Sequence, residues 1–387
     1  MRIFIRRLFI GVLIYLSLFT GNCFAVAKSS VSIETSGFSG GEWSFPYVTA
    51  HSALLMDALT GEILYERDAH RQRPPASTTK VLTAIVALEM AKLNEIATVS
   101  EKADQVGESS IYLNKGNRLA LRELLEGALI RSGNDACVAI AEQAAGSLDE
   151  FMRLMNLKAV SLGATRSNFV NPHGLPDKNH YSTAYDLAVI ARYAMQDETF
   201  AHIVAQKYST IEYEEPAKIQ EVKNTNKLLW TYPYADGIKT GTTNAAGKCL
   251  IASASKEGRR LICVLLDAPD RFGDAERLMD WGFKNTEIVS FGKKGDPVAT
   301  FPFAGSDIPL VLTKDLNICI RKENINTLGY EIKLKPLVRK EIKAGEVLGY
   351  YYIFTPERLL KKEVLVTPRN YKSSPLNFFK QHLKQIS

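Results

Sequence analysis

A serine and a lysine three residues apart, Ser77 and Lys80, stand at the start of an apolar run that continues to Met90. Pro74 and Pro75 end whatever precedes them, so the pattern predicts a buried helix that begins near Ser77. The Ser77 hydroxyl would then lie beside unpaired backbone N–H groups, which favour the negative charge of an alkoxide attacking a carbonyl. Because Lys80 would share that helix face, the pair predicts a serine nucleophile with a lysine base.

The Ser-x-x-Lys spacing is not specific by itself. It also occurs at Ser253 to Lys256 and at Ser290 to Lys293. An N-capping serine followed by a surface lysine is the ordinary explanation of such a pair. The copy at Ser77 differs because it opens a buried apolar helix and has chemical partners downstream.

Two further motifs supply those partners. Ser132-Gly133-Asn134 separates a helical pattern that begins at Leu119 from another that begins at Ala136, which predicts a tight loop between helices. Lys239-Thr240-Gly241-Thr242 belongs to a strand-like run from Asp236 to Thr242. The chain thus carries two hydroxyls, two amines and an amide that folding could bring together.

Taken together, the three motifs resemble those of the serine penicillin-recognising enzymes, which include penicillin-binding proteins and class A β-lactamases. Asn171-Pro172-His173-Gly174-Leu175, Tyr181 to Asp186 and Asp236 to Gly241 are most similar to the low-molecular-mass D-alanyl-D-alanine carboxypeptidases. The resemblance covers about Ala50 to Phe283. It implies an α/β (α+β) fold, with an antiparallel sheet and a helical region in the catalytic domain and a small β-rich domain after it.

The resemblance also implies catalytic roles. Ser77 would attack the carbonyl between the last two D-alanines of a peptidoglycan stem peptide, and Lys80 would accept its proton. Ser132 would pass a proton to the leaving amine, and the N–H groups of Ser77 and Thr242 would form the oxyanion hole. Substrate binding, including contact with the peptide amide and the terminal carboxylate, would fall to Asn134, Lys239, Thr240, Gly241 and Thr242.

One position departs from the family pattern. Some of these carboxypeptidases have an arginine before an Asn-Gly-Leu-Leu stretch, whereas this chain has Thr225 before Asn226-Lys227-Leu228-Leu229. The substrate carboxylate would then depend on Lys239 and the threonines, or on Lys227.

Three alternative functions share these features. A class A β-lactamase needs a glutamate that directs water onto the acyl-enzyme, and no glutamate occurs between Glu150 and Glu198. β-Lactams are therefore expected to act as covalent inhibitors. An endopeptidase that cuts cross-links stays open, because its motifs are the same. A non-catalytic wall-binding or penicillin-sensing module is disfavoured because the chemical residues are all intact, namely Ser77, Lys80, Ser132, Asn134 and Lys239.

Metal and cofactor chemistry find little support in the sequence. His173 and His180 could suggest a metal site or a serine–histidine pair, but histidines beside Pro and Gly in a loop are more often structural. The five cysteines are widely spaced and match no zinc or disulfide framework, so we expect no metal, no cofactor and no structural disulfide.

The N-terminus predicts export. Arg2, Arg6 and Arg7 precede an apolar run from Leu8 to Phe19, and small residues follow at Ala25-Val26-Ala27. An uncleaved anchor is the alternative, although the run is short for a bilayer span. Cys23 fits a lipoprotein site poorly because Asn22 precedes it. The protein is expected in the periplasm or on the outer face of the cytoplasmic membrane.

Composition shifts predict the domain order. Residues 1–27 read as a signal peptide, 28–47 as a leader, 48–285 as the catalytic domain, 286–366 as a β-rich domain and 367–387 as a tail. The net charge of +6 forms no dense basic stripe, so nucleic acid is not an expected partner.

The tail has a helical stripe of apolar residues with lysines on another face. Leu376, Phe379, Leu383 and Ile386 form the stripe, while Lys380 and Lys384 face elsewhere. Such a helix suits an anionic membrane surface, and docking on its own protein is an equal alternative.

Overall fold

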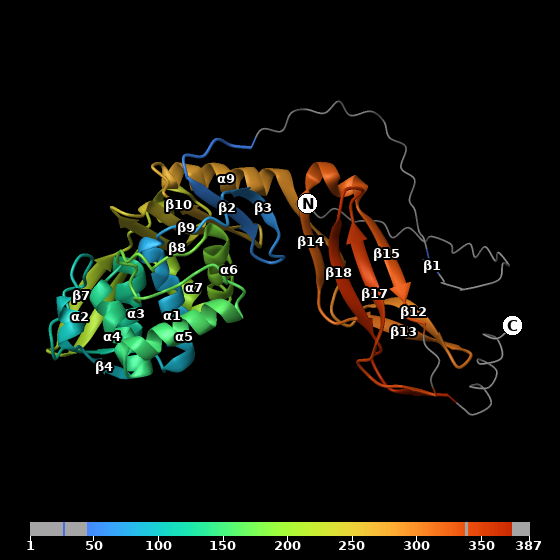
Figure 1. The fold of residues 1–387 in the computed structure, drawn as a ribbon, viewed down its shortest axis with the longest axis horizontal. Helices are drawn as coiled ribbons and strands as arrows, with labels where there is room; N and C mark the ends of the chain where they lie inside the picture. The colour runs from blue at the N-terminus through green and yellow to red at the C-terminus, as the bar shows by residue number, and fades with distance from the viewer. Residues whose placement is uncertain (1–25, 28–44, 337–339, 374–387) are drawn as a thin grey trace. The chain divides into compact units, whose positions relative to one another are not determined.

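The computed structural model describes residues 26–27, 45–336 and 340–373 (Figure 1). Most of the predicted signal peptide and leader, and the tail from residue 374, lie outside these residues. The chain divides into two compact units. Among the described residues, the larger unit holds 45–290 and 317–326, and the smaller holds 26–27, 291–316 and most of 327–373.

A five-stranded antiparallel sheet forms the centre of the larger unit, in the order β3-β2-β10-β9-β8. Its strands are β2 (Ser52–Asp57), β3 (Ile63–Arg67), β8 (Ala235–Thr243), β9 (Gly247–Lys256) and β10 (Arg259–Leu266). This order shows that early and late parts of the chain complete one sheet. It also leaves β8, which carries Lys239 to Thr242, at an edge.

Both faces of this sheet are buried, which explains why β10 is a continuous apolar run. Ile262 and Val264 point into a cluster formed with the helical region, while Leu261 and Cys263 pack with Leu278 of α9 (Arg271–Asn285). Figure 1 shows α9 on one side of the sheet and α1 (Lys80–Met90) and α6 (Ala184–Ala194) on the other. The side-chain period of two along a strand produces this division.

The larger unit contains several further helices among its described residues. They are α2 (Glu101–Gln105), α3 (Leu121–Glu126), α4 (Asn134–Ala145), α5 (Leu148–Ser161), α7 (Glu198–Ala205) and α8 (Leu228–Thr231). A second sheet contains β4 (Ile96–Thr98), β5 (Arg118–Ala120), β6 (Tyr208–Glu215) and β7 (Lys218–Lys223).

The structure corrects one predicted helix. The apolar pattern from Leu119 to Leu129 predicts a single helix, but Leu119 lies in strand β5 and α3 ends at Glu126. A π-helical turn, η2 (Gly127–Arg131), follows. Leu119 pairs with Ala97 and Tyr213 across the second sheet, and this tertiary pairing overrides the local helical period.

The smaller unit is β-rich, as the alternating patterns predict. Its six-stranded sheet has the order β1-β15-β17-β18-β13-β12. The strands of this unit are β1 (Val26–Ala27), β12 (Pro297–Phe303), β13 (Ser306–Leu312), β15 (Gly329–Leu334), β16 (Glu341–Ile342), β17 (Val347–Phe354), β18 (Leu359–Val366) and β19 (Tyr371–Lys372). Most of β11 (Thr286–Gly292), β14 (Leu316–Arg321) and η3 (Lys322–Thr327) belongs to the larger unit. The predicted α+β class is confirmed.

Neither a membrane-spanning helix nor a disulfide occurs in the described part of the chain. No helix there has both the length and the apolar character needed to cross a bilayer. The thiols of Cys137, Cys249, Cys263 and Cys319 are free and buried.

Candidate active site

Ser77 lies in a 3-10 turn, η1 (Ala76–Thr79), that leads directly into α1. The predicted buried helix beginning near Ser77 is therefore confirmed. The hydroxyl of Thr78 donates a hydrogen bond to the carbonyl of Pro75 (2.6 Å), and that of Thr79 donates to Ala76 (2.9 Å). These side-chain bonds to the backbone hold the turn in place.

Two glycines let neighbouring backbones approach this turn. A Cβ on Gly241 of β8 would lie 2.9 Å from the backbone nitrogen of Ser77. A Cβ on Gly174 would lie 1.8 Å from the carbonyl oxygen of Ala76, and Gly174 has a φ of +93°. Strand β8 and the loop 171–175 therefore flank Ser77 at distances that only glycine permits.

Lys80 joins three parts of the chain around Ser77. Its side chain is completely buried, and Nζ donates to Ser77 Oγ (2.8 Å) and to Asn134 Oδ1 (2.7 Å). A third bond runs from Nζ to the carbonyl oxygen of His173 (3.0 Å). These acceptors match the three hydrogens of an ammonium group. One turn further along α1, Thr83 donates to the carbonyl of Pro172 (2.6 Å), which fixes the same loop.

The Ser132-Gly133-Asn134 loop connects η2 to α4, in agreement with the prediction of a tight loop. Ser132 has a left-handed backbone, with φ of 72°. The buried carboxylate of Asp135 accepts hydrogen bonds from the N–H groups of Ile111 and Leu113, both at 3.0 Å. Asn134 uses its Nδ2 to donate to the carbonyl of Gly107 (3.0 Å). Both ends of the Asn134 amide are thus engaged in positioning the loop and Lys80.

Lys239 forms a second contact with this loop. Its Nζ donates to Ser132 Oγ (2.9 Å) and to the carbonyl of Thr240 (3.0 Å), and its side chain is buried. The structure therefore brings the predicted residues together as two adjacent pairs. Ser77 contacts Lys80, and Ser132 contacts Lys239.

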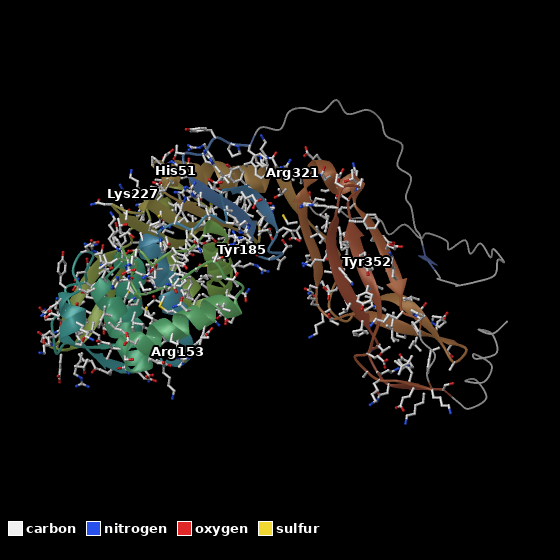
Figure 2. All side chains as sticks on the ribbon, viewed as in Figure 1. His51, Arg153, Tyr185, Lys227, Arg321 and Tyr352 are labelled. Carbon is white, nitrogen blue, oxygen red and sulfur yellow. The ribbon has the colours of Figure 1, made fainter. Side chains whose placement is uncertain are left out.

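Two further side chains contact the Lys-Thr-Gly strand, and one of them, Arg271, could not be identified from local spacing. Thr225, which replaces the expected arginine, lies with its Oγ1 2.7 Å from Thr240 Oγ1. Arg271, at the start of α9, donates from one terminal nitrogen to the carbonyl of Gly241 (2.7 Å) and to Thr242 Oγ1 (2.9 Å). Arg271 adds a positive charge next to Thr242, whereas Lys227 has an exposed side chain (Figure 2).

Burial of the two amines weakens their basicity. It lowers the pKa of Lys80 from 10.5 to about 8. It also lowers the pKa of Lys239 well below its usual range, and the positive charge of Lys80 adds to that effect. Neither amine makes an ion pair with a carboxylate in the part of the chain that the structure describes, so hydrogen bonds to neutral oxygens are their main polar contacts.

The two histidines have structural contacts. His180 Nε2 lies 2.9 Å from Thr79 Oγ1, and its Nδ1 accepts the N–H of Val170 (3.1 Å). Burial lowers the pKa of His173 to about 3 and that of His180 to about 4, so both are neutral near pH 7. Within the described residues, no group of three or more His, Cys, Asp or Glu residues could hold a metal ion.

The fold and the serine–lysine arrangement define the class of serine penicillin-recognising enzymes. The sequence matches the family model described as D-alanyl-D-alanine carboxypeptidase over residues 42–270. It also matches the model described as Penicillin-binding protein 5, C-terminal domain, over residues 283–373. The chain therefore belongs to the D-alanyl-D-alanine carboxypeptidase family.

Relatives and solved structures agree with this assignment. The D-alanyl-D-alanine carboxypeptidase DacF of Bacillus subtilis is 35% identical, over 78% of this chain and 80% of the relative. Penicillin binding protein 5 of Haemophilus influenzae superposes with a TM-score of 0.77 at 28% identity, covering 85% of this chain and all of that structure. A mutant of the Streptomyces K15 DD-transpeptidase gives a TM-score of 0.59 at 31% identity, and the match covers 62% of this chain and 99% of that structure. These likenesses confirm the predicted fold.

The contact at Gly174 leads to a mutational prediction. A Gly174→Ala substitution combines left-handed backbone strain with a clash against the Ala76 carbonyl, so we expect a loss of roughly 2–4 kcal/mol in unfolding free energy. Activity should fall as well, because the clash displaces the turn that carries Ser77. Thermal and urea unfolding, together with steady-state activity, would measure both effects.

Gly116→Ala is the matched control for this substitution. Gly116 has a similar φ of +87°, but nothing lies within 4 Å of the added Cβ. The Gly116→Ala variant should lose only about 1 kcal/mol of unfolding free energy and should retain activity. Equal losses in the two variants would show that the close approach at Ala76 has no importance of its own.

Proposed function

We propose that the chain acts as a serine-type D-Ala-D-Ala carboxypeptidase that removes the terminal D-alanine from peptidoglycan stem pentapeptides through an acyl-enzyme on Ser77. The observation that carries this proposal is the 2.8 Å contact between Lys80 Nζ and Ser77 Oγ at the start of a buried helix. Membership of the D-alanyl-D-alanine carboxypeptidase family supports the substrate class.

In the first step, the neutral form of Lys80 accepts the Ser77 proton while Oγ attacks the carbonyl carbon between the two D-alanines. The negative charge on the carbonyl oxygen is stabilised by the N–H groups of Ser77 and Thr242. A preorganised donor of this kind contributes about 3 kcal/mol to transition-state stabilisation. The close approach of Gly241 to Ser77 supports this arrangement, since it brings β8 beside the turn.

In the second step, the bond to the leaving D-alanine breaks and its nitrogen takes a proton from the Ser132 hydroxyl. Lys239, 2.9 Å from Ser132 Oγ, restores that proton, and the Lys80 ammonium passes the proton it took from Ser77 to Lys239, so that Lys80 is neutral again. Water then attacks the acyl carbon and gives a proton to the neutral Lys80. As the bond between the acyl carbon and Ser77 Oγ breaks, Lys80 returns this proton to Oγ and the shortened peptide leaves. Each proton that moves has a donor and an acceptor within this network.

Edge strand β8 provides the direction of substrate binding. An extended peptide can add to a free sheet edge, and among the described strands β8 pairs only with β9. The terminal carboxylate would meet Lys239, Thr240 and Thr242, and the Arg271 charge beside Thr242 adds to their attraction. Asn134 would contact the substrate amide with the hydrogen-bonding capacity that its bonds to Lys80 and Gly107 leave.

β-Lactamase activity is the weaker alternative. The loop 171–175 presents the carbonyl oxygen of His173 to Lys80, not a carboxylate. A penicillin acyl-enzyme would therefore lack the glutamate that directs water in class A enzymes, and it should hydrolyse slowly.

The role of Ser77 is tested by intact-mass measurement after brief exposure to a β-lactam, with D-alanine release from a diacetyl-Lys-D-Ala-D-Ala peptide followed in parallel. We expect a long-lived adduct and D-alanine release, and both should disappear in Ser77→Ala. A penicillin turnover of many per second would instead favour a β-lactamase. An adduct without D-alanine release would contradict carboxypeptidase activity.

The lowered pKa of Lys80 predicts the pH dependence of acylation. With a pKa of about 8, about a tenth of Lys80 is neutral at pH 7 and about half at pH 8. Because the neutral amine is the base, the acylation rate should rise about fivefold over this interval and level off above pH 9. Stopped-flow acylation by a β-lactam at several pH values would measure it.

The control for this profile is Lys80→Arg, which keeps a positive charge at every accessible pH. It should acylate very slowly without a rise near pH 8. A wild-type rate that stays constant from pH 6.5 to 8.5 would rule out Lys80 as the titrating base.

The enzyme is proposed to work outside the cytoplasm, where its wall substrate lies, with the tail making peripheral contact with the membrane. The supporting pattern is the apolar stripe from Leu376 to Ile386 with Lys380 and Lys384. Deletion of 375–387 should lower the membrane-bound fraction of the exported protein on sedimentation. A Lys380→Glu, Lys384→Glu variant should show weaker binding to anionic vesicles. A membrane-bound fraction that is unchanged by the deletion would contradict membrane contact by the tail.

A further inference from the structure

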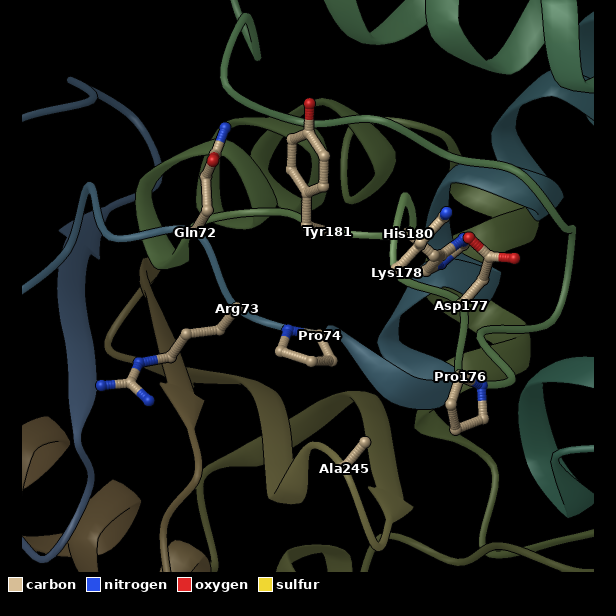
Figure 3. A pocket seen from close by; sticks show the side chains of 9 residues that line it. All are labelled: Gln72, Arg73, Pro74, Pro176, Asp177, Lys178, His180, Tyr181 and Ala245. Carbon is tan, nitrogen blue, oxygen red and sulfur yellow. The ribbon is translucent and has the colours of Figure 1, made fainter.

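A cavity of about 540 Å³ opens in the larger unit next to the turn that carries Ser77 (Figure 3). Its lining comes from residues 72–74, 176–178, 180–181 and 245. Pro74 precedes Ser77 by three residues, and Ala245 follows Thr242 by three. Because three residues span at most about 11 Å, the cavity lies within that distance of both proposed oxyanion donors.

The cavity lies at the upstream end of the proposed substrate path, and this step rests on the proposed function. With the terminal carboxylate at Lys239 and the scissile carbonyl at Thr242, a peptide along β8 continues toward Ala245. Each extended residue advances about 3.3 Å. The stem residue before the two D-alanines therefore begins near Thr242, and a long side chain from it reaches roughly 10 Å from the scissile carbon, to the cavity.

The cavity offers one acidic and one basic side chain without competing ion pairs. Asp177 and Lys178 are adjacent and exposed, and Figure 3 shows them together at one end. Asp177 Oδ1 accepts the N–H of Asn179 (2.7 Å), which orients the carboxylate. Within the described residues, neither Asp177 Oδ2 nor Lys178 Nζ makes a hydrogen bond or an ion pair, and the negative charge of Asp177 also acts on the buried ring of His180.

Three other polar side chains of the lining are held by other parts of the fold. Arg73 Nε donates to Ser52 Oγ (2.8 Å), and Gln72 Nε2 donates to the carbonyl of Arg166 (3.2 Å). His180 is buried and bonded to Thr79. Asp177 and Lys178 are thus the charged groups of the cavity that a ligand can reach.

We propose that this cavity binds the side chain of the stem residue before the two D-alanines, and that it selects a diamino acid whose side chain ends in both an amine and a carboxylate. The Asp177 carboxylate pairs with the amine and the Lys178 ammonium with the carboxylate. A lysine side chain satisfies only Asp177, and an apolar side chain satisfies neither. Exposed ion pairs contribute modestly, so the preference for the zwitterion over lysine should be about 1.5-fold to fivefold.

The test compares kcat/KM for D-alanine release from three N-acetylated X-D-Ala-D-Ala peptides, in which X is 2,6-diaminopimelate, lysine or norleucine. The wild-type enzyme should prefer them in that order. Lys178→Met should bring the diaminopimelate peptide to the level of the lysine peptide. Asp177→Asn, which keeps the acceptor for Asn179, should bring the lysine peptide to the level of the norleucine peptide.

The norleucine peptide separates this proposal from the proposed function. All variants should hydrolyse it at the wild-type rate, and Lys102→Met, an exposed lysine on α2, should leave the order of the three peptides unchanged. Equal rates for the diaminopimelate and lysine peptides in the wild type, or a preference that survives both substitutions, would overturn the proposal. Failure of the wild type to hydrolyse any peptide would overturn the proposed function and this inference with it.

Discussion

Two buried lysine amines that have no carboxylate partner among the described residues are the constraint on which this site depends. Lys80 is bound by Ser77, Asn134 and the His173 carbonyl, and Lys239 by Ser132 and the Thr240 carbonyl. A carboxylate partner would raise the pKa and hold the proton on the amine. Neutral oxygens accept the hydrogen bonds of the amines without raising the amine pKa. The pKa of Lys80 can therefore fall to about 8, where an amine can act as a base.

The rest of the larger unit positions those oxygens. The His173 carbonyl reaches Lys80 because Thr83 holds Pro172 and because Gly174 allows the loop to touch Ala76. Asn134 points inward because the Asp135 carboxylate ties α4 to the segment from Ser110 to Leu113. These are long-range contacts between loops and helix ends. They make the site rigid, which preorganised electrostatic catalysis requires.

Local patterns predicted the parts of the site that lie close together in sequence. The i, i+3 spacing of Ser77 and Lys80, the loop at Ser132 and the strand at Lys239 were all recoverable from residue type and period. The Gly174 approach and the Arg271 contacts were not, because they join segments far apart in the chain. The β6–β7 hairpin was also missed. Its buried residues, such as Ile211 and Val222, alternate with many charged ones that hide the strand period.

The same burial has a thermodynamic consequence for the whole fold. The unfolded chain binds a proton at Lys80 with a pKa near 10.5, whereas the folded chain binds it at about 8. Between these values the unfolded state holds more protons, so this group makes the fold more stable as pH rises from about 8 to 10.5. Below pH 8 the full penalty of roughly 3 kcal/mol remains. At neutral pH the protein thus carries a destabilising charge in its core. Part of the stability supplied by the doubly buried sheet must offset this charge so that Lys80 can accept a proton from Ser77.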